Sequence, residues 1–181
     1  LGGYLRKNTA LSSLNLSGNA LGDRGACILA MHLKQRSGLD DLNLEKTGIQ
    51  AEGAACLLQP DASHTLPKEL WLGSNHLAGL SNMDDNPLSD KSLHVLHLDN
   101  CNLDDKASYS LAALIKHFKV LKQLNTSDNS LSDDAIAAFS QAVLDHDQLS
   151  IWNMQYSIVT DRGEAQLQKL ARLKPSITIQ Y

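Results

Sequence analysis

The chain has 181 residues, of which 43% are hydrophobic and 20% charged, and its formal net charge is −4 at pH 7. This composition is that of an ordinary soluble domain, long enough to form a continuous core. No apolar run approaches the length of a membrane span, and no signal-peptide pattern opens the sequence. The acidic balance argues against nucleic acid, which favours basic surfaces. We therefore expect neither a membrane nor a nucleic acid as partner.

An eleven-residue pattern recurs along most of the chain, and residues 121–131 (LKQLNTSDNSL) show it in full. Its copies start at residues 11, 39, 67, 93, 121 and 149, so successive starts are 28, 28, 26, 28 and 28 residues apart. A fixed period of this size is typical of a solenoid.

The first half of each copy predicts a short strand. In the first copy Leu14 and Leu16 are two residues apart, so both side chains face the core while the residues between and beside them face out. The ninth place holds a small polar residue, most often Asn, whose side chain can bond backbone groups where the strand turns away. From the first copy to the last, this ladder reads Asn19, Thr47, Asn75, Cys101, Asn129 and Ser157.

Behind each strand the apolar spacing changes from two residues to about 3.6, which predicts a helix. In the first copy the apolar stripe is Ala26, Leu29, Ala30 and Leu33, and Asp23 is a plausible N-cap. Four later copies carry corresponding stripes: Ala54, Leu57 and Leu58; Ser108, Leu111, Ala112 and Ile115; Ile136, Phe139 and Val143; Leu167, Leu170, Ala171 and Leu173.

Stacking such units predicts a curved molecule. Parallel strands lie about 4.8 Å apart whereas helices need about 10 Å, so the stack bends with its strands inside. The strands then line a concave face.

The period of 28, the Gly25-Ala26 and Gly53-Ala54 helix starts and the alternating ladder resemble the ribonuclease-inhibitor-like subclass of leucine-rich repeats over residues 11–173. The resemblance implies an α/β fold: a right-handed solenoid with parallel strands on the concave face and helices on the convex face. Members of that subclass include enzyme inhibitors, NOD-like receptors, GTPase-activating proteins and secreted bacterial effectors. No motif here selects among them.

We therefore expect a protein-binding module without cofactor or enzymatic activity, with an inhibitor or regulator of another enzyme as the alternative. The expected location is the cytoplasm or, for a bacterial effector, the host cytosol.

The repeats predict a single domain over residues 1–181 that ends in a last strand near 177–179. Residues 5–11 align with residues 33–39, so the chain begins inside the helix of an earlier repeat. Because a bare apolar end of a solenoid is poorly soluble, we expect a fragment of a longer chain.

Two connections depart from the pattern. Polar residues and Pro87 oppose a helix in 78–92, and Pro60 cuts the second helix short before 60–66. We interpret both as tolerated loop variation on the convex side, with a dedicated binding element as the alternative.

The three cysteines, Cys27, Cys56 and Cys101, are odd in number and lie in different copies. We expect buried small residues rather than disulfides or metal ligands, and hence a reducing compartment. His94 and His97 fall on opposite faces of a strand, which disfavours a zinc site. A hydrolase using Cys101 and His97 would need the two in contact, and position 101 is expected to turn inward as a ladder residue.

The outward positions of the strands carry the best functional signal. Trp71 is the outlier, because an aromatic side chain at a solvent-facing strand position is typical of a binding hot spot. Acidic residues surround it, which predicts a protein partner with Lys or Arg at the contact, although such charges are also common on simple solvated faces. The candidate binding residues are Asp41, Glu45, Glu69, Trp71, His97, Asp99, Asp128 and Tyr156.

Overall fold

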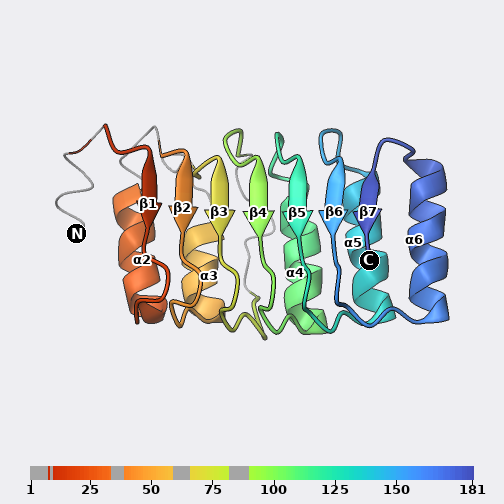
Figure 1. Ribbon diagram of the computed structural model, residues 1–181, viewed down its shortest axis with the longest axis horizontal. Coiled ribbons are helices and arrows are strands. Elements are labelled where there is room, and N and C mark those ends of the chain that lie inside the picture. Colours follow the sequence, from red (N-terminus) through yellow and green to blue (C-terminus); the bar gives the residue numbers. More distant parts are fainter. Residues whose placement is uncertain (1–7, 9, 34–38, 59–65, 82–89) are drawn as a thin grey trace.

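The computed structural model describes residues 8, 10–33, 39–58, 66–81 and 90–181. Seven strands form one parallel sheet in chain order, and five helices lie behind it in the view of Figure 1. The strands are β1 (Ser13–Asn15), β2 (Asp41–Asn43), β3 (Glu69–Trp71), β4 (Val95–His97), β5 (Gln123–Asn125), β6 (Ile151–Asn153) and β7 (Thr178–Gln180). The helices are α2 (Gly22–Leu33), α3 (Ala51–Leu58), α4 (Asp105–Ile115), α5 (Asp133–Leu144) and α6 (Asp161–Leu173).

The sheet register repeats the period of the sequence. Residues at the same place of the repeat pair directly, so that Leu42, Leu70, Leu96 and Leu124 are neighbours across strands and all face the helices. These four leucines are at most 1% exposed. The predicted alternation of the strands is therefore confirmed. Trp152, which stands in β6 at the place of these leucines, is also fully buried.

The helices bury the predicted stripes. Ala26, Leu29 and Leu33 of α2 and Leu167 and Leu170 of α6 are all 4% exposed or less. The prediction was wrong at the end of the last stripe, where Ala171 and Leu173 are exposed. The physical reason is position, because α6 is the last helix of the described residues and packs against a neighbouring helix, α5, on one side only.

Hydrogen bonds of the ladder asparagines explain why asparagine alternates with a smaller residue along the ladder. The side-chain oxygen of Asn75 accepts the backbone N–H groups of Thr47 and Ile49 at 3.1 and 3.0 Å, and its amide nitrogen donates to the carbonyls of Leu44 and Leu72 at 2.8 Å each. One Asn thus satisfies the buried turns of two repeats, its own and the preceding one.

Asn129 repeats the arrangement two units later. It accepts from the N–H groups of Cys101 and Leu103 and donates to the carbonyls of Leu98 and Thr126. The preceding repeat therefore needs only a small ladder residue, here Cys101, whose thiol donates to the carbonyl of Leu72 at 3.2 Å.

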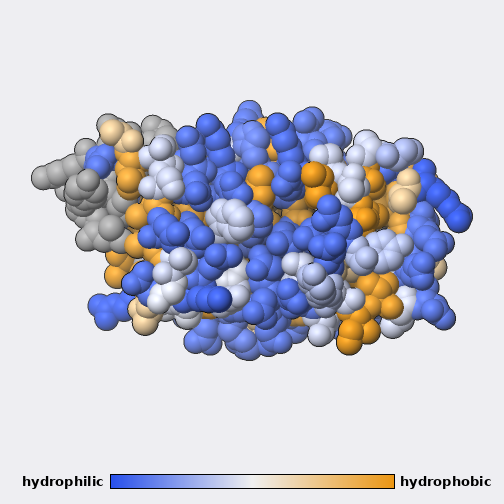
Figure 2. Space-filling view, viewed as in Figure 1, coloured by the Kyte–Doolittle hydropathy of each residue, from blue (hydrophilic) through white to orange (hydrophobic). Residues whose placement is uncertain are grey.

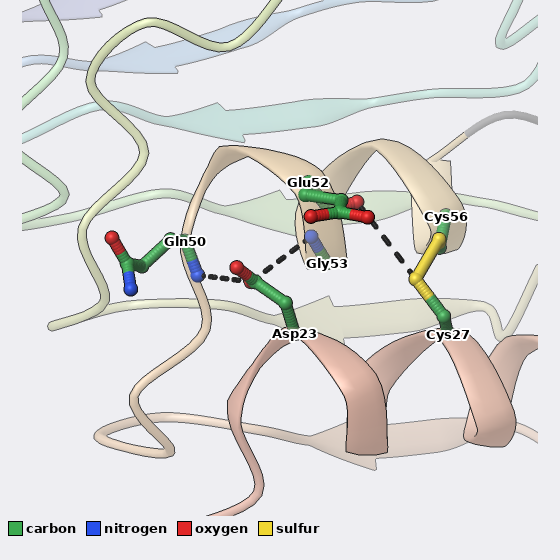
Figure 3. Close-up of a disulfide and its surroundings, with 6 residues drawn as sticks. All are labelled: Asp23, Cys27, Gln50, Glu52, Gly53 and Cys56. Atoms are coloured by element: carbon green, nitrogen blue, oxygen red, sulfur yellow. Dashed lines mark hydrogen bonds between the residues drawn. A yellow bond between two sulfur atoms is a disulfide. The ribbon is translucent and has the colours of Figure 1, made fainter.

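Asp23 does not cap its own helix, contrary to prediction. It lies inside the first turn of α2, and its Oδ1 accepts the N–H groups of Gln50 and Gly53 at the start of α3, at 2.6 and 3.0 Å (Figure 3). Adjacent helices lie side by side with their N-terminal ends level, so a carboxylate of one reaches the free N–H groups of the next.

The cysteine prediction was also wrong for two of the three residues. Cys27 of α2 and Cys56 of α3 form a disulfide, with their Cα atoms 5.0 Å apart (Figure 3). The two lie 29 residues apart, one more than the usual repeat step, which puts them on facing sides of neighbouring helices. Cys101 is free and buried, as predicted for a ladder residue.

The irregular connections fall largely outside the described residues, namely 59–65 and 82–89. The described parts of the second segment, 78–81 and 90–92, contain no helix, and α3 ends at Leu58 as Pro60 predicts. Among the helices of the described residues, none combines the length and the apolar character that crossing a bilayer requires.

Candidate functional site on the open face of the sheet

The sheet face turned away from the helices, here called the open face, carries the outward side chains of the strands. Figure 2 shows this face as largely hydrophilic, with separate hydrophobic patches. The parallel register aligns these side chains in rows across the sheet. One row is Asp41, Glu69, Val95, Gln123 and Ile151, and the next is Asn43, Trp71, His97, Asn125 and Asn153.

Trp71 lies on the open face, between Leu70 and Leu72, which are 1% and 0% exposed. Its ring stacks on that of His97 in the neighbouring strand, with ring centroids 3.6 Å apart and an interplanar angle of 7°. The indole is therefore half-buried rather than fully exposed. A rigid aromatic side chain held in this way needs little further ordering to make a contact.

Besides its stack with Trp71, the His97 ring contacts the carboxylate of Glu69. The Nε2 atom of His97 is 3.1 Å from Oε1 of Glu69, and the two side chains are 15% and 37% exposed. Glu69, Trp71 and His97 thus form one connected cluster across β3 and β4, and the structure brings together three of the residues that the sequence singled out.

Three further carboxylates lie nearby, on β2 and in the turns after β2 and β4, and each accepts a hydrogen bond from a neutral side chain. Asp41 accepts from Ser13 at 3.3 Å, Glu45 from Asn43 at 3.2 Å, and Asp99 from Asn125 at 3.2 Å. Among the described residues, none of these carboxylates or Glu69 forms an ion pair with a Lys or Arg. Their negative charge is therefore available to an outside cation.

Gly73 is a site residue that the sequence reasoning missed. A Cβ atom placed on it would lie 2.6 Å from Oδ2 of Asp99, so the absence of a side chain leaves room for that carboxylate beside β3. The signal was available, because the same place holds Ser17, Glu45, Asp99, Ser127 and Gln155 in the other repeats.

Asp128 and Tyr156 are not part of the Trp71 cluster. They occupy the turns after β5 and β6, with φ angles of 54° and 59°, and both are exposed. Tyr156 is 82% exposed, and Ile158, two residues further along the chain, is 78% exposed. Sequence reasoning missed Ile158, although the same place holds Gly48, His76, Asn102 and Ser130 in earlier repeats.

The Cys101 thiol is unsuited to nucleophilic catalysis. Burial raises its pKa to about 12, so the thiolate is scarce at neutral pH. His97 is engaged with Glu69 and Trp71 instead. Within the part of the chain that the structure describes, no three His, Cys, Asp or Glu side chains gather as metal ligands would.

Comparison with known proteins gives relatives along almost the whole chain. The chain is 28% identical over 185 residues to "NACHT, LRR and PYD domains-containing protein 3" of Rattus norvegicus, covering 98% of this chain and 18% of that protein. It is 30% identical over 188 residues to "Ribonuclease inhibitor" of Sus scrofa, covering 97% of this chain and 40% of that protein. The chain thus spans less than half the length of either relative. No family model matches it.

Among solved structures, the tropomodulin C-terminal domain of Caenorhabditis elegans is similar, with a TM-score of 0.58 at 13% sequence identity, over 96% of this chain and 90% of that one. At this identity the similarity concerns the fold alone. The repeat, the parallel sheet with its helices on one side, the asparagine ladder and the relatives agree. The chain is therefore a leucine-rich repeat protein of the ribonuclease-inhibitor-like subclass.

Proposed function

We propose that this chain is a protein-binding module, not an enzyme, that docks a protein partner on the open face of its sheet with Trp71 as the central anchor. The observation that carries the proposal is the Glu69–Trp71–His97 cluster, an aromatic surface fixed in place on a face that is largely hydrophilic. Rigid aromatic side chains of this kind carry much of the binding free energy in protein interfaces.

The chemistry of the partner follows from the charges around the anchor. Asp41, Glu45, Glu69 and Asp99 have no Lys or Arg partner among the described residues. A partner presenting basic side chains would supply the missing cations, and an arginine could also lie on the indole ring. Tyr156 and Ile158, three strands further along, offer a second apolar contact to a partner long enough to span both.

The chain's relatives support a binding role in two forms. Ribonuclease inhibitor is by name an inhibitor of an enzyme, which favours regulation of an enzyme as the second candidate function. The NACHT proteins favour a module within a larger receptor, and with them a cytoplasmic location. An activity assay on the captured partner separates the two, because only a regulator changes its partner's turnover.

The test compares two aromatic side chains on opposite sides of the molecule, the half-buried Trp71 and the exposed Tyr109. Partners are captured on the immobilised chain, and the affinity of each is then measured for the wild type, for Trp71→Ala and for Tyr109→Ala. Tyr109 lies on α4 and is 47% exposed, so it controls for the loss of an aromatic surface away from the open face. We expect Trp71→Ala to weaken binding by at least about 2 kcal/mol and Tyr109→Ala to leave it unchanged.

Salt supplies a second readout of the same site. Because the proposed contacts are exposed charge pairs, affinity should fall as ionic strength rises. A folded Trp71→Ala variant that binds its partner as well as the wild type would refute this site. The patch of Tyr156 and Ile158, and the segments 60–66 and 78–92, would then be tested next.

A further inference from the structure

The disulfide between Cys27 and Cys56 lies on the helix side of the molecule, away from the open face. It joins the middle of α2 to the end of α3, and both cysteines are partly exposed (Figure 3). Figure 3 also shows the Asp23 contact with α3, which ties the N-terminal ends of the same two helices. The pair therefore connects two helices that already have a separate attachment.

Apolar side chains between α2 and α3 hold the two helices in contact independently of the disulfide. Ala26 and Leu29 of α2 and Ala54 and Leu57 of α3 are at most 3% exposed. Gly53 lets the helices approach closely, since a Cβ atom there would lie 2.8 Å from Cα of Asp23. Breaking the sulfur bond therefore leaves the apolar core covered.

Cys27 can be reached from solvent. It borders an open hollow together with Asp23, Arg24, Ile28, Met31 and Glu52, and Ile28 and Met31 are 43% and 53% exposed. Arg24 precedes Cys27 by three residues on α2 and lines the same hollow, together with the carboxylates of Asp23 and Glu52. The carbonyl oxygen of Glu52 lies 4.0 Å from the sulfur of Cys27.

We propose that Cys27 and Cys56 form a reversible redox clasp, closed by a hydroperoxide and opened by a small thiol or dithiol. In closing, the Cys27 thiolate attacks one oxygen of the hydroperoxide and breaks the O–O bond. It becomes a sulfenic acid, and the other oxygen leaves as water or an alcohol after taking up a proton. The Cys56 thiol then attacks the sulfenic sulfur, and the hydroxyl leaves as water with the thiol proton. Two electrons pass from the two thiols to the peroxide.

The clasp controls the opening of one junction between repeats. In a solenoid each repeat contacts only its neighbours, so one junction can open while the rest stays folded. Closing the bond between residues 27 and 56 restricts that local opening, because the helices can no longer separate. Oxidation thus stiffens the part of the molecule that carries α2 and α3 and leaves α5 and α6 as they were.

The test uses the full chain carrying Cys101→Ser, so that the pair holds the only remaining thiols. Serine stands at the equivalent ladder place 157, which makes this background conservative. The reduced protein is treated with hydrogen peroxide and then with dithiothreitol, with intact mass, peptide mapping and amide hydrogen exchange recorded at each stage. Wild-type protein is carried in parallel and serves alone if the Cys101→Ser background does not fold.

We expect peroxide to remove two hydrogens and to link the peptides of Cys27 and Cys56, and dithiothreitol to reverse both changes. Amides of α2 and α3 should exchange about tenfold or more slowly in the oxidised form, while those of α5 and α6 should not change. Cys27→Ser and Cys56→Ser, each compared with the reduced parent, should fold and should lose both the peptide link and the slowing of exchange, while Cys56→Ser should still gain oxygen at Cys27.

Three results would overturn the proposal. One is oxidation to sulfinic acid without a link between the two peptides. Another is a disulfide that survives a large excess of reduced glutathione in the folded protein, which would make it a permanent staple. The third is equal exchange of α2 and α3 in the two redox states, which would show that the bond restrains nothing.

Discussion

The two tryptophans lie on opposite faces of the same sheet, and their truncation should destabilise the protein to different extents. Trp71 is half-buried and stacks on His97, whereas Trp152 is 0% exposed, contacts Phe139 and donates its indole N–H to Thr126 at 3.0 Å. We expect Trp71→Ala to lower the free energy of unfolding by no more than about 1.5 kcal/mol. Trp152→Ala should lower it by about 3–5 kcal/mol. Urea unfolding of the two variants checks this, and losses of equal size would show that Trp71 is a core residue.

His146 makes stability depend on pH. Its Nε2 atom donates to the carbonyl of Phe118 at 2.8 Å, and its Nδ1 atom accepts the N–H groups of Gln148 and Leu149 at 3.2 and 3.0 Å. Protonation of Nδ1 would break two of these bonds, and burial lowers the pKa of His146 below its usual 6.5. The unfolded chain therefore takes up this proton first as pH falls. The contribution of His146 to stability is complete above pH 6.5 and is lost as pH falls through the lowered value.

The matched variant is His146→Asn. Two repeats earlier Asp90 fills the same place, and its Oδ1 accepts the N–H groups of Ser92 and Leu93 at 2.9 and 2.8 Å. An asparagine oxygen can take the same role without titrating. We expect the variant to be less stable than the wild type at pH 8, where it lacks the bond to Phe118, and to lose less stability between pH 7 and pH 5. Urea unfolding at each pH measures the slope, and equal slopes would assign the effect to another group, such as His117, whose pKa burial also lowers.

At the level of the helices, glycine controls how closely neighbours approach. A Cβ atom on Gly53 would lie 2.6 Å from Oδ1 and 2.8 Å from Cα of Asp23, so the backbone of α2 would have to move. On Gly163 of α6 the three nearest atoms would all belong to side chains, namely those of Asp133 at 2.9 Å, Ile136 at 3.0 Å and Val159 at 3.1 Å. Intrinsic helix propensity favours alanine over glycine by about 1 kcal/mol at both places.

We expect the clash to outweigh propensity at Gly53 and not at Gly163. Gly53→Ala should lower the free energy of unfolding by about 1–3 kcal/mol, the usual range for overpacking. Gly163→Ala should change it by less than about 1 kcal/mol, because side-chain ends can turn aside. Both variants are compared in urea with the disulfide in the same redox state. A stabilised Gly53→Ala would mean that α2 and α3 are less tightly packed than the structure has them.

The sequence predicts features that depend on periodicity and misses those that depend on lateral distance. Alternation at Leu14 and Leu16 settles which strand face is buried, and the same rule places Trp71 on the open face. The bond between Cys27 and Cys56, and the reach of Asp23 into α3, depend on how near two helices lie and how they are rotated, which no spacing within one repeat contains. The Trp71–His97 stack likewise depends on side-chain rotamers in two strands whose register had first to be known.

At the scale of the whole molecule, the ladder divides the solenoid into pairs of repeats. Asn75 and Asn129 each satisfy two turns, while Thr47 and Cys101 occupy the space that a neighbouring asparagine leaves. The smallest unit whose removal leaves every ladder residue with a neighbour of the same type is therefore two repeats rather than one.

The effect of deleting repeats should therefore depend on whether the deletion removes an even number of them. Excising residues 67–120 would bring Thr47 next to Asn129, the kind of junction already present. Excising only 93–120 would place Asn75 against Asn129, with two amides competing for one set of backbone groups. We expect the variant that lacks residues 67–120 to unfold cooperatively on heating. The variant that lacks only 93–120 is the longer chain but should melt at a lower temperature, which calorimetry would show. If such chains lengthen or shorten by recombination, copies should be gained and lost in twos.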